Sequence, residues 1–229
     1  MSATFVHHRI DAAPRRWQAV ADRLAGDGAR RVIEAGGQLY GAWRSQIGRP
    51  RDEVQAISVW PQPVTAASAE AALLRGEAEI RTVASEAMTP TLRPTDTVPP
   101  TRQGNYAFRW FAVPAPQWPE FLDLCAAAWP GFEGAYDSQV IGLWQATGDR
   151  TGTASDEVTG AGLQGGVRSL LLTRRPNLAM WERSKLPEGE AEAAVRDKLS
   201  RRYDLCDWTV VSTATLLTAV DRADTARWT

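Results

Sequence analysis

The chain contains one pattern twice, at a spacing of about a hundred positions. Trp17 and Trp118 are separated by 118 − 17 = 101 positions, and the segment Gly41–Trp43 recurs at Gly142–Trp144 with the same offset. Repeats of solenoid proteins are only about 20–50 residues long. A repeat of this length instead predicts that each copy is a domain and that the chain is an internal duplication.

Hydrophobic periodicity predicts the same order of elements in both copies. Apolar residues at i, i+3, i+4 and i+7 from Trp17 indicate a helix. A short strand precedes this helix. A hairpin, an alanine-rich helix and a last strand follow it. The strands expected in the two copies are 5–10, 38–44, 53–60, 88–93, 106–113, 138–147, 166–174 and 208–217, and the other helices are 66–87, 117–129 and 177–203. This order is that of a ferredoxin-like α+β domain.

The domain boundaries follow from the repeat. We expect copy one at 1–95, a proline-rich extended linker at 96–104, copy two at 105–219 and a polar tail at 220–229. Val54 corresponds to Val167, so the offset there is 167 − 54 = 113 and copy two holds 113 − 101 = 12 extra residues in its hairpin loop. A glycine- and threonine-rich loop of this kind is either functional or merely tolerated.

Charge and composition exclude several classes of function. A formal net charge of −1 argues against binding to nucleic acid or to an anionic membrane. No apolar run reaches the roughly 18 residues of a membrane span, and the N-terminus has neither the basic nor the apolar region of a signal peptide. Cys125 and Cys206 lie in apolar contexts, as reduced thiols do in a cytoplasmic protein.

Metal and cofactor sites are not expected. His7 and His8 are the only histidines, whereas zinc or iron needs three or four converging ligands. The sequence also lacks a nucleophile elbow, a phosphate-binding loop and a dinucleotide fingerprint. We therefore predict no metal and no cofactor.

Several short motifs point to a known family. The pattern is formed by Phe5–Ile10, Gly37–Arg44 and Asp52–Trp60 of copy one and by Tyr106–Phe111 and Gly142–Trp144 of copy two. It resembles the NIPSNAP branch of the dimeric α/β-barrel superfamily, which has a first strand with an alternating arginine and a Gly-x-Trp hairpin strand. In copy two the second hairpin strand lacks the aromatic residues of that pattern.

The resemblance implies a fold and a range of activities. Members of this superfamily pack two ferredoxin-like sheets face to face into a barrel, and here the tandem copies would form that barrel within one chain. A homodimer of such pseudo-dimers is left open. The superfamily includes cofactor-free monooxygenases, cyclases, isomerases, dehydratases and haem-handling enzymes, so the fold does not give the reaction. Its haem-binding members place a histidine later in the chain, and this sequence has none after position 8.

Strand alternation suggests candidate catalytic residues. Successive strand residues point to opposite faces, so only one of His7 and His8 can face the barrel lumen. The alternating arginine of the family corresponds to Arg109 and, in copy one, to His8; we expect this face to be inside. His8 would then act as general acid or base, Arg109 would stabilise an anion and Tyr40 would assist. The alternative is that His8 is a satisfied strand residue.

Aromatic residues on the strands suggest a ligand site. Trp43, Trp60, Trp144 and Phe111, with Arg44, are the predicted substrate-binding residues, because aromatics around a lumen suit a flat apolar ligand. Tryptophan in a sheet is also a common core residue, and that alternative stays open.

Two functions follow from these residues. One is a cofactor-free enzyme that binds a small hydrophobic, aromatic or polyketide-like molecule in the lumen and carries out proton transfer in a cyclisation, isomerisation, dehydration or monooxygenation. The other is a non-catalytic NIPSNAP-type protein that binds a small ligand or a partner, with a lumen filled by its own side chains.

Overall fold

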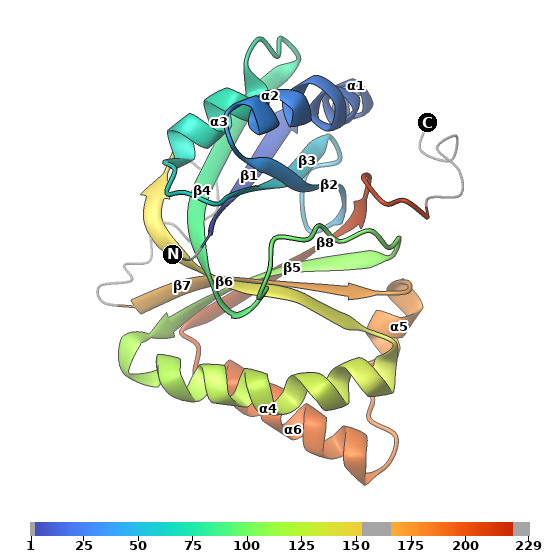
Figure 1. Ribbon diagram of the computed structural model, residues 1–229. Coiled ribbons are helices and arrows are strands. Elements are labelled where there is room, and N and C mark those ends of the chain that lie inside the picture. Colours follow the sequence, from blue (N-terminus) through green and yellow to red (C-terminus); the bar gives the residue numbers. More distant parts are fainter. Residues whose placement is uncertain (1–2, 153–165, 222–229) are drawn as a thin grey trace.

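The two copies fold into one closed β-barrel with helices on opposite sides, as the computed structural model shows (Figure 1). The structure describes residues 3–152 and 166–221. The first half contains β1 (Thr4–Ala12), α1 (Trp17–Arg23), the π-helical turn η1 (Leu24–Gly28), α2 (Ala29–Glu34), β2 (Gln38–Ile47), β3 (Glu53–Trp60), α3 (Ala66–Leu74) and β4 (Ile80–Arg93). The second half contains β5 (Asn105–Pro114), the 3-10 turn η2 (Ala115–Gln117), α4 (Trp118–Tyr136), β6 (Gln139–Arg150), β7 (Gly166–Arg175), α5 (Leu178–Arg183), α6 (Glu190–Asp204) and β8 (Trp208–Leu216).

The strands join in the order β1-β3-β2-β8-β5-β7-β6-β4, and the last closes onto the first. Each half supplies four consecutive members of this ring. The halves meet at two antiparallel seams, where Trp43 of β2 lies opposite Leu216 of β8 and Met88 of β4 lies opposite Ala146 of β6. The expected α+β fold, two ferredoxin-like copies that form a barrel within one chain, is thereby confirmed.

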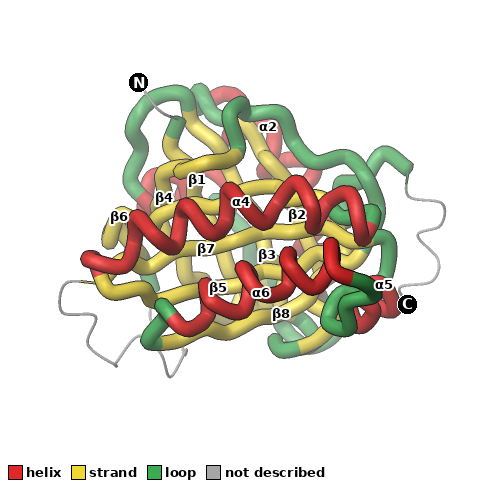
Figure 2. The backbone as a smooth tube through the Cα atoms, turned by 90° about the horizontal axis from the view of Figure 1, so that it is seen from below, coloured by secondary structure: helices red, strands yellow, loops and turns green. Residues whose placement is uncertain are grey.

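Helices cover the outer face of each half. In Figure 1, α1, α2 and α3 lie on one side of the barrel, and α4 and α6 lie on the other. Figure 2 shows α4 and α6 side by side across the strands of the second half. Each half therefore has two buried faces, one toward the lumen and one toward its helices. None of the helices within the described ranges is long and apolar enough to cross a membrane.

The repeated Gly-x-Trp motif has a packing role in the lumen. Gly41 and Trp43 lie on the same face of β2, as do Gly142 and Trp144 on β6. A Cβ at either glycine would lie 2.4 Å from the indole ring of the tryptophan two residues on. Both tryptophans are fully buried in the lumen core. The glycines are therefore needed so that each indole can lie across its own strand.

Replacing Gly142 with alanine is expected to lower the free energy of unfolding by about 1–3 kcal/mol, the usual range for overpacking a filled core. The new methyl group would also lie 2.8 Å from Pro94, so Trp144 has little room to yield. Gly134→Ala is the control, because a Cβ at this helical glycine meets no atom within 4 Å. Urea unfolding of both variants tests this, and equal midpoints would contradict the packing role.

Three predicted helices differ in the structure. The helical region expected over 177–203 is divided into α5 and α6, with Pro187 between them. The alanine-rich helix over 66–87 ends at Leu74, and β4 begins at Ile80, because strand residues here pair with both β1 and β6. Gly76, at φ +78°, lies in the turn between them. The helix predicted to end at 129 continues through Pro130 to Tyr136. Most of the expected loop insertion and of the tail lies outside the described residues.

Candidate functional site

The lumen, where the site was expected, has a densely packed aromatic core. Trp43, Trp144, Tyr106 and Phe108 are at most 1% exposed and belong to one cluster. The ring centroids of Trp43 and Phe108 lie 5.3 Å apart in an edge-to-face arrangement. Tyr40 is 2% exposed in the same cluster, and burial raises its pKa, which makes it a weak acid. Three predicted site residues, Tyr40, Trp43 and Trp144, are therefore core residues of the lumen.

The expected orientation of the first strands is wrong. His7 faces the lumen, where its ring stacks 5.5 Å from Phe108, and the adjacent His8 faces the helices of the first half. In the second half, Phe111 belongs to the core under the helices, and Arg109 shares its face of β5. The lumen instead takes the aromatic face of each first strand. His8 and Arg109 therefore lie on opposite sides of the molecule, and the structure does not bring them together.

His8 is fixed in a buried hydrogen-bond network. Its Nδ1 lies 2.8 Å from the hydroxyl of Ser85 and its Nε2 lies 2.9 Å from the hydroxyl of Ser58. The Ser85 hydroxyl donates to Glu70, and the indole N–H of Trp60 donates to Ser58. Burial lowers the pKa of His8 to about 3. These contacts satisfy a neutral imidazole and suit a structural role.

The other predicted ligand residues also lie in packed places. Trp60 belongs to the core under the first-half helices, and its ring covers Gly37. The guanidinium of Arg44 lies 4.2 Å from the ring of Trp17, on the helix side of β2. Phe111 is fully buried, and Arg202 lies over its ring at 4.9 Å.

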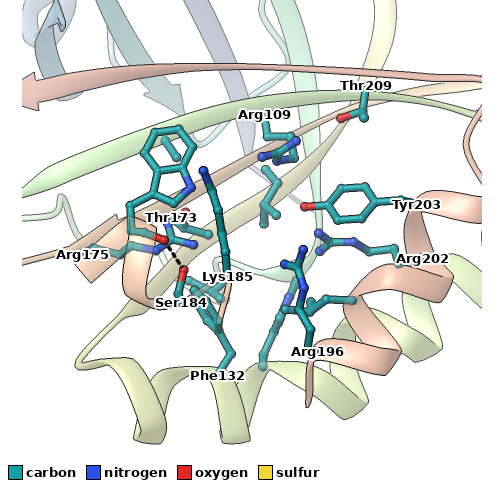
Figure 3. Close-up of a pocket in the computed structure, with 16 residues that line it drawn as sticks. Arg109, Phe132, Thr173, Arg175, Ser184, Lys185, Arg196, Arg202, Tyr203 and Thr209 are labelled. Atoms are coloured by element: carbon teal, nitrogen blue, oxygen red, sulfur yellow. Dashed lines mark hydrogen bonds between the residues drawn. The ribbon is translucent and has the colours of Figure 1, made fainter. Parts of the chain in front are cut away.

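A cavity lies between the second-half sheet and its helices (Figure 3). Its volume is about 340 Å³, within the range of small-molecule sites. Strands β5, β6, β7 and β8 form one wall, and α4, α5 and α6 form the others. The lining residues are Ala107, Arg109, Trp129, Phe132, Val140, Leu171, Thr173, Arg175, Trp181, Ser184, Lys185, Arg196, Leu199, Arg202, Tyr203 and Thr209.

The lining is strongly cationic. Five of the sixteen residues are basic and none is acidic. Arg175 is 9% exposed and Arg202 is 2% exposed. In the part of the chain that the structure describes, neither of them, nor Arg109, forms a salt bridge with a carboxylate. Burying a guanidinium without a counter-charge costs several kcal/mol. The cavity therefore combines concentrated positive charge with low solvent exposure.

Desolvation lowers the pKa of two of these arginines. Burial, together with the nearby Arg109, lowers the pKa of Arg175 to about 10. Burial also lowers the pKa of Arg109. The Nε atoms of Arg175 and Arg202 are buried and have no hydrogen-bond partner within the described ranges. Such groups are stabilised by any anion that enters the cavity.

Tyr203 places a phenol among the arginines. Burial alone would raise its pKa, but the positive charges of Arg202, Arg109 and Arg196 outweigh burial and lower the pKa below its usual value. The guanidinium of Arg109 lies 5.3 Å from the ring centroid of Tyr203, and the Tyr203 hydroxyl points into the cavity (Figure 3). Tyr203 is therefore the lining residue best suited to give up and accept a proton.

Aromatic rings complete the cavity. Phe132 and Trp129 come from α4, and Trp181 comes from α5. The guanidinium of Arg175 lies 4.9 Å from the Phe132 ring and 5.8 Å from the Trp181 ring. The aromatic faces stabilise the arginines in part and give a bound ligand an apolar surface.

Comparison with known proteins places the fold. No family model matches the sequence, and no curated protein is similar to it in sequence. Solved structures do match: a candidate monooxygenase from Lactobacillus acidophilus has a TM-score of 0.54 at 12% identity, with 96% of this chain and 98% of that chain covered. An anthrone oxidase-like protein gives 0.53 at 13%, covering 95% and 92%. A variant of the chlorite dismutase from Candidatus Nitrospira defluvii gives 0.56 at 8%, covering 93% and 92%.

The chain shares their fold. At these identities the similarity concerns the barrel of two ferredoxin-like halves, and function depends on the side chains of the site. None of the cavity-lining residues is a histidine, cysteine or methionine, and Tyr203 alone is of a type that ligates haem iron. The lining therefore does not fit a haem held by histidine. No group of three or more His, Cys, Asp or Glu side chains in the described parts of the chain could hold a metal ion.

The sequence pattern identifies one residue of the cavity, Arg109, as a site residue and does not identify the others. A signal was present in α6, where Arg196, Leu199 and Tyr203 follow a helical period and Arg202 continues the stripe of Val195 and Leu199. Basic residues on the apolar face of a helix point toward the interior rather than toward water. That pattern predicts a charged site under the helix.

Proposed function

We propose that this protein binds a small organic anion with a flat apolar body in the cationic cavity and transfers a proton to or from it. The observation that supports the proposal is the cluster of buried arginines without a carboxylate partner within the described ranges. An anion would neutralise them, and Trp129, Phe132 and Trp181 would contact its apolar part. A site of this kind combines a few polar groups with an apolar wall, as ligand pockets do.

The proton would move through Tyr203. As phenolate, its oxygen accepts a proton from an acidic C–H or O–H of the ligand, and as phenol it returns one. Arg109 would stabilise the anion that forms, the role assigned to it from the sequence, although it acts in this cavity and not in the lumen. Such chemistry serves a cyclisation, isomerisation, dehydration or monooxygenation. The solved structures of similar fold include candidate oxygen-using enzymes.

Binding can be tested by tryptophan fluorescence, because Trp129 and Trp181 line the cavity. Titration with benzoate, salicylate and naphthoate is expected to give saturable quenching. Arg109→Gln should weaken binding about tenfold, the typical effect of losing one hydrogen bond to a charged group. Arg30→Gln is the control, because its side chain is 70% exposed on α2. The anion site is refuted if no compound quenches, or if the two variants behave alike.

The proton-transfer step predicts an unusual tyrosine. The chain has four tyrosines; the pKa values of Tyr40, Tyr106 and Tyr136 are raised, chiefly by burial, and that of Tyr203 is lowered. One tyrosine is therefore expected to ionise below about pH 10, the usual value. Ultraviolet absorbance of tyrosinate during a pH titration measures this. The early transition should vanish in Tyr203→Phe and persist in Tyr136→Phe; its persistence in Tyr203→Phe would remove Tyr203 from the mechanism.

A second candidate is a non-catalytic NIPSNAP-type protein that binds a small ligand or a partner. The filled lumen supports it, because the aromatic core around Trp43 and Trp144 occupies the space that a lumenal enzyme would use. The two candidates differ in turnover. To separate them, an anion that binds in the fluorescence titration is incubated with the protein in air and then analysed by mass spectrometry. Conversion of the anion that Tyr203→Phe abolishes supports the enzyme. An unchanged anion supports the binding protein.

A further inference from the structure

The basic residues of the cavity form two groups rather than one. In Figure 3, Arg109, Arg196 and Arg202 lie with Tyr203 at one end; we call these arginines the first cationic group. Arg175 and Lys185 lie at the other end and form the second cationic group. The first group comes from β5 and α6, and the second comes from β7 and the segment after α5. The two groups therefore come from different elements of the second half.

The first group is the more deeply buried. Arg202 has a thiol and a phenol as polar neighbours: its Nη1 lies 3.7 Å from the Sγ of Cys125, and Tyr203 faces it from the same helix. Arg109 lies over the Tyr203 ring. A single phenolate can neutralise at most one of the three guanidiniums. Donor groups thus remain for an anionic ligand at this end.

The second group also has unused donors. Arg175 Nη1 donates to the hydroxyl of Thr173 at 3.1 Å, and its Nε is buried without a partner in the described structure. Lys185 lies at the rim, where it pairs with Glu182 at 2.8 Å and lies above the Trp181 ring. Arg175 is thus the main anion-binding residue of this end, and Lys185 adds positive charge at the entrance.

The same cavity also has apolar surface. Phe132 and Trp129 of α4 and Leu171 of β7 are among its lining residues. A ligand with one anionic group would compensate one cationic group and leave the other buried without a counter-charge. Two anionic groups on a rigid body would compensate both.

We infer that the natural ligand is a dianion, with an anionic group at each end of a rigid aromatic or similarly flat body. The inference rests on the proposed anion site and names its ligand class. The cavity volume of about 340 Å³ suits a body of one or two rings. One anionic group would lie among Arg109, Arg196 and Arg202, and the other would lie against Arg175.

Calorimetric titration with benzoate, isophthalate and terephthalate tests this inference, because the three share one ring and differ in the number and placement of carboxylates. At least one dicarboxylate is expected to bind more than about tenfold tighter than benzoate to the wild type. Arg175→Gln should reduce the dicarboxylate to the affinity of benzoate and leave benzoate within about twofold. Arg196→Gln should weaken all three ligands. Lys185→Gln, at the exposed rim, should have the smaller effect on the dicarboxylate.

The outcomes separate the two levels of the proposal. Equal affinities for benzoate and both dicarboxylates would overturn the dianion and leave the anion site standing. Equal weakening of benzoate and dicarboxylate by Arg175→Gln would also overturn it, because the two ends would then act as one. Binding of none of the three would overturn both proposals. Thermal unfolding of each variant without ligand shows whether the variant is folded. If Arg175→Gln is not folded, the affinities of Lys185→Gln for the dicarboxylate and for benzoate still test the second cationic group.

Discussion

Lowering the pH from about 7 to about 5 is expected to reduce the free energy of unfolding by about 4 kcal/mol, through two adjacent histidines. Burial lowers the pKa of both His7 and His8 from 6.5 to about 3. The unfolded chain therefore binds two protons as the pH falls through 6.5, and the folded chain does not. Their stabilising contribution is complete above pH 6.5 and decreases steadily between 6.5 and 3.

The two contributions should be nearly additive, because the neighbouring residues face different cores. His7 lies in the lumen, where it binds Gln55 and stacks on Phe108. His8 lies under the first-half helices between Ser58 and Ser85. Each histidine thus accounts for about half of the acid sensitivity.

Urea unfolding at the two pH values measures the effect. His7→Gln and His8→Gln lower the stability at neutral pH to different degrees, so the informative quantity is the change between the two pH values. This loss of stability between pH 7 and pH 5 should be about half as large in each single variant as in the wild type. In the double variant it should nearly disappear. A wild type equally stable at both pH values would show that the imidazoles are protonated in the folded state.

Replacing Arg175 with methionine is expected to stabilise the ligand-free protein by about 1–3 kcal/mol and to reduce the affinity for a dicarboxylate to that for benzoate, a loss of more than about tenfold. Methionine keeps much of the volume and the contacts with Phe132 and Trp181, and it removes a buried charge without a carboxylate partner in the described structure. A residue that destabilises the empty protein is expected where binding depends on it.

Thermal and urea unfolding without ligand, together with the titration of terephthalate, test both parts of this prediction. Arg168→Met is the matched control, because Arg168 forms a two-oxygen salt bridge with Glu86 at 2.7 Å. That variant should be destabilised, since both contacts between Arg168 and the Glu86 carboxylate are lost. If Arg175→Met were destabilised to the same degree, Arg175 would have a structural counter-charge and the argument for a ligand would fail.

The fold was predictable because its signals repeat. The Gly-x-Trp segments, the helix stripe from Trp17 and the constant offset predicted two ferredoxin-like copies, and the resemblance to the dimeric α/β-barrel superfamily implied that these form one barrel. The extent of β4 was not predictable, because the alanine-rich segment that opens it suits a helix locally. Its strand conformation depends on pairing with β1 and with β6 of the other half, contacts that no local pattern contains.

The site was predictable only in part. Arg109 was found through the repeat, but the orientation of its strand was not, since both faces of β1 and β5 mix polar and apolar residues. The deciding fact is that Tyr106, Phe108 and Trp110 pack against residues of the other half in the lumen. Arg175 belongs to β7, whereas Arg196 and Arg202 belong to α6, and only the packing of α6 on the sheet brings them together.

The joining of both halves in one polypeptide has a consequence for stoichiometry. His8 and Arg109 occupy the same place in the repeat, yet one is held in a closed network and the other lines the cavity. In a barrel made from two identical chains, both positions would hold the same residue, and every change at one would appear at the other. Gene fusion lets one half serve as a stable frame while the other accumulates unfavourable charge. We therefore expect one ligand per chain, where a symmetric ancestor would have held two.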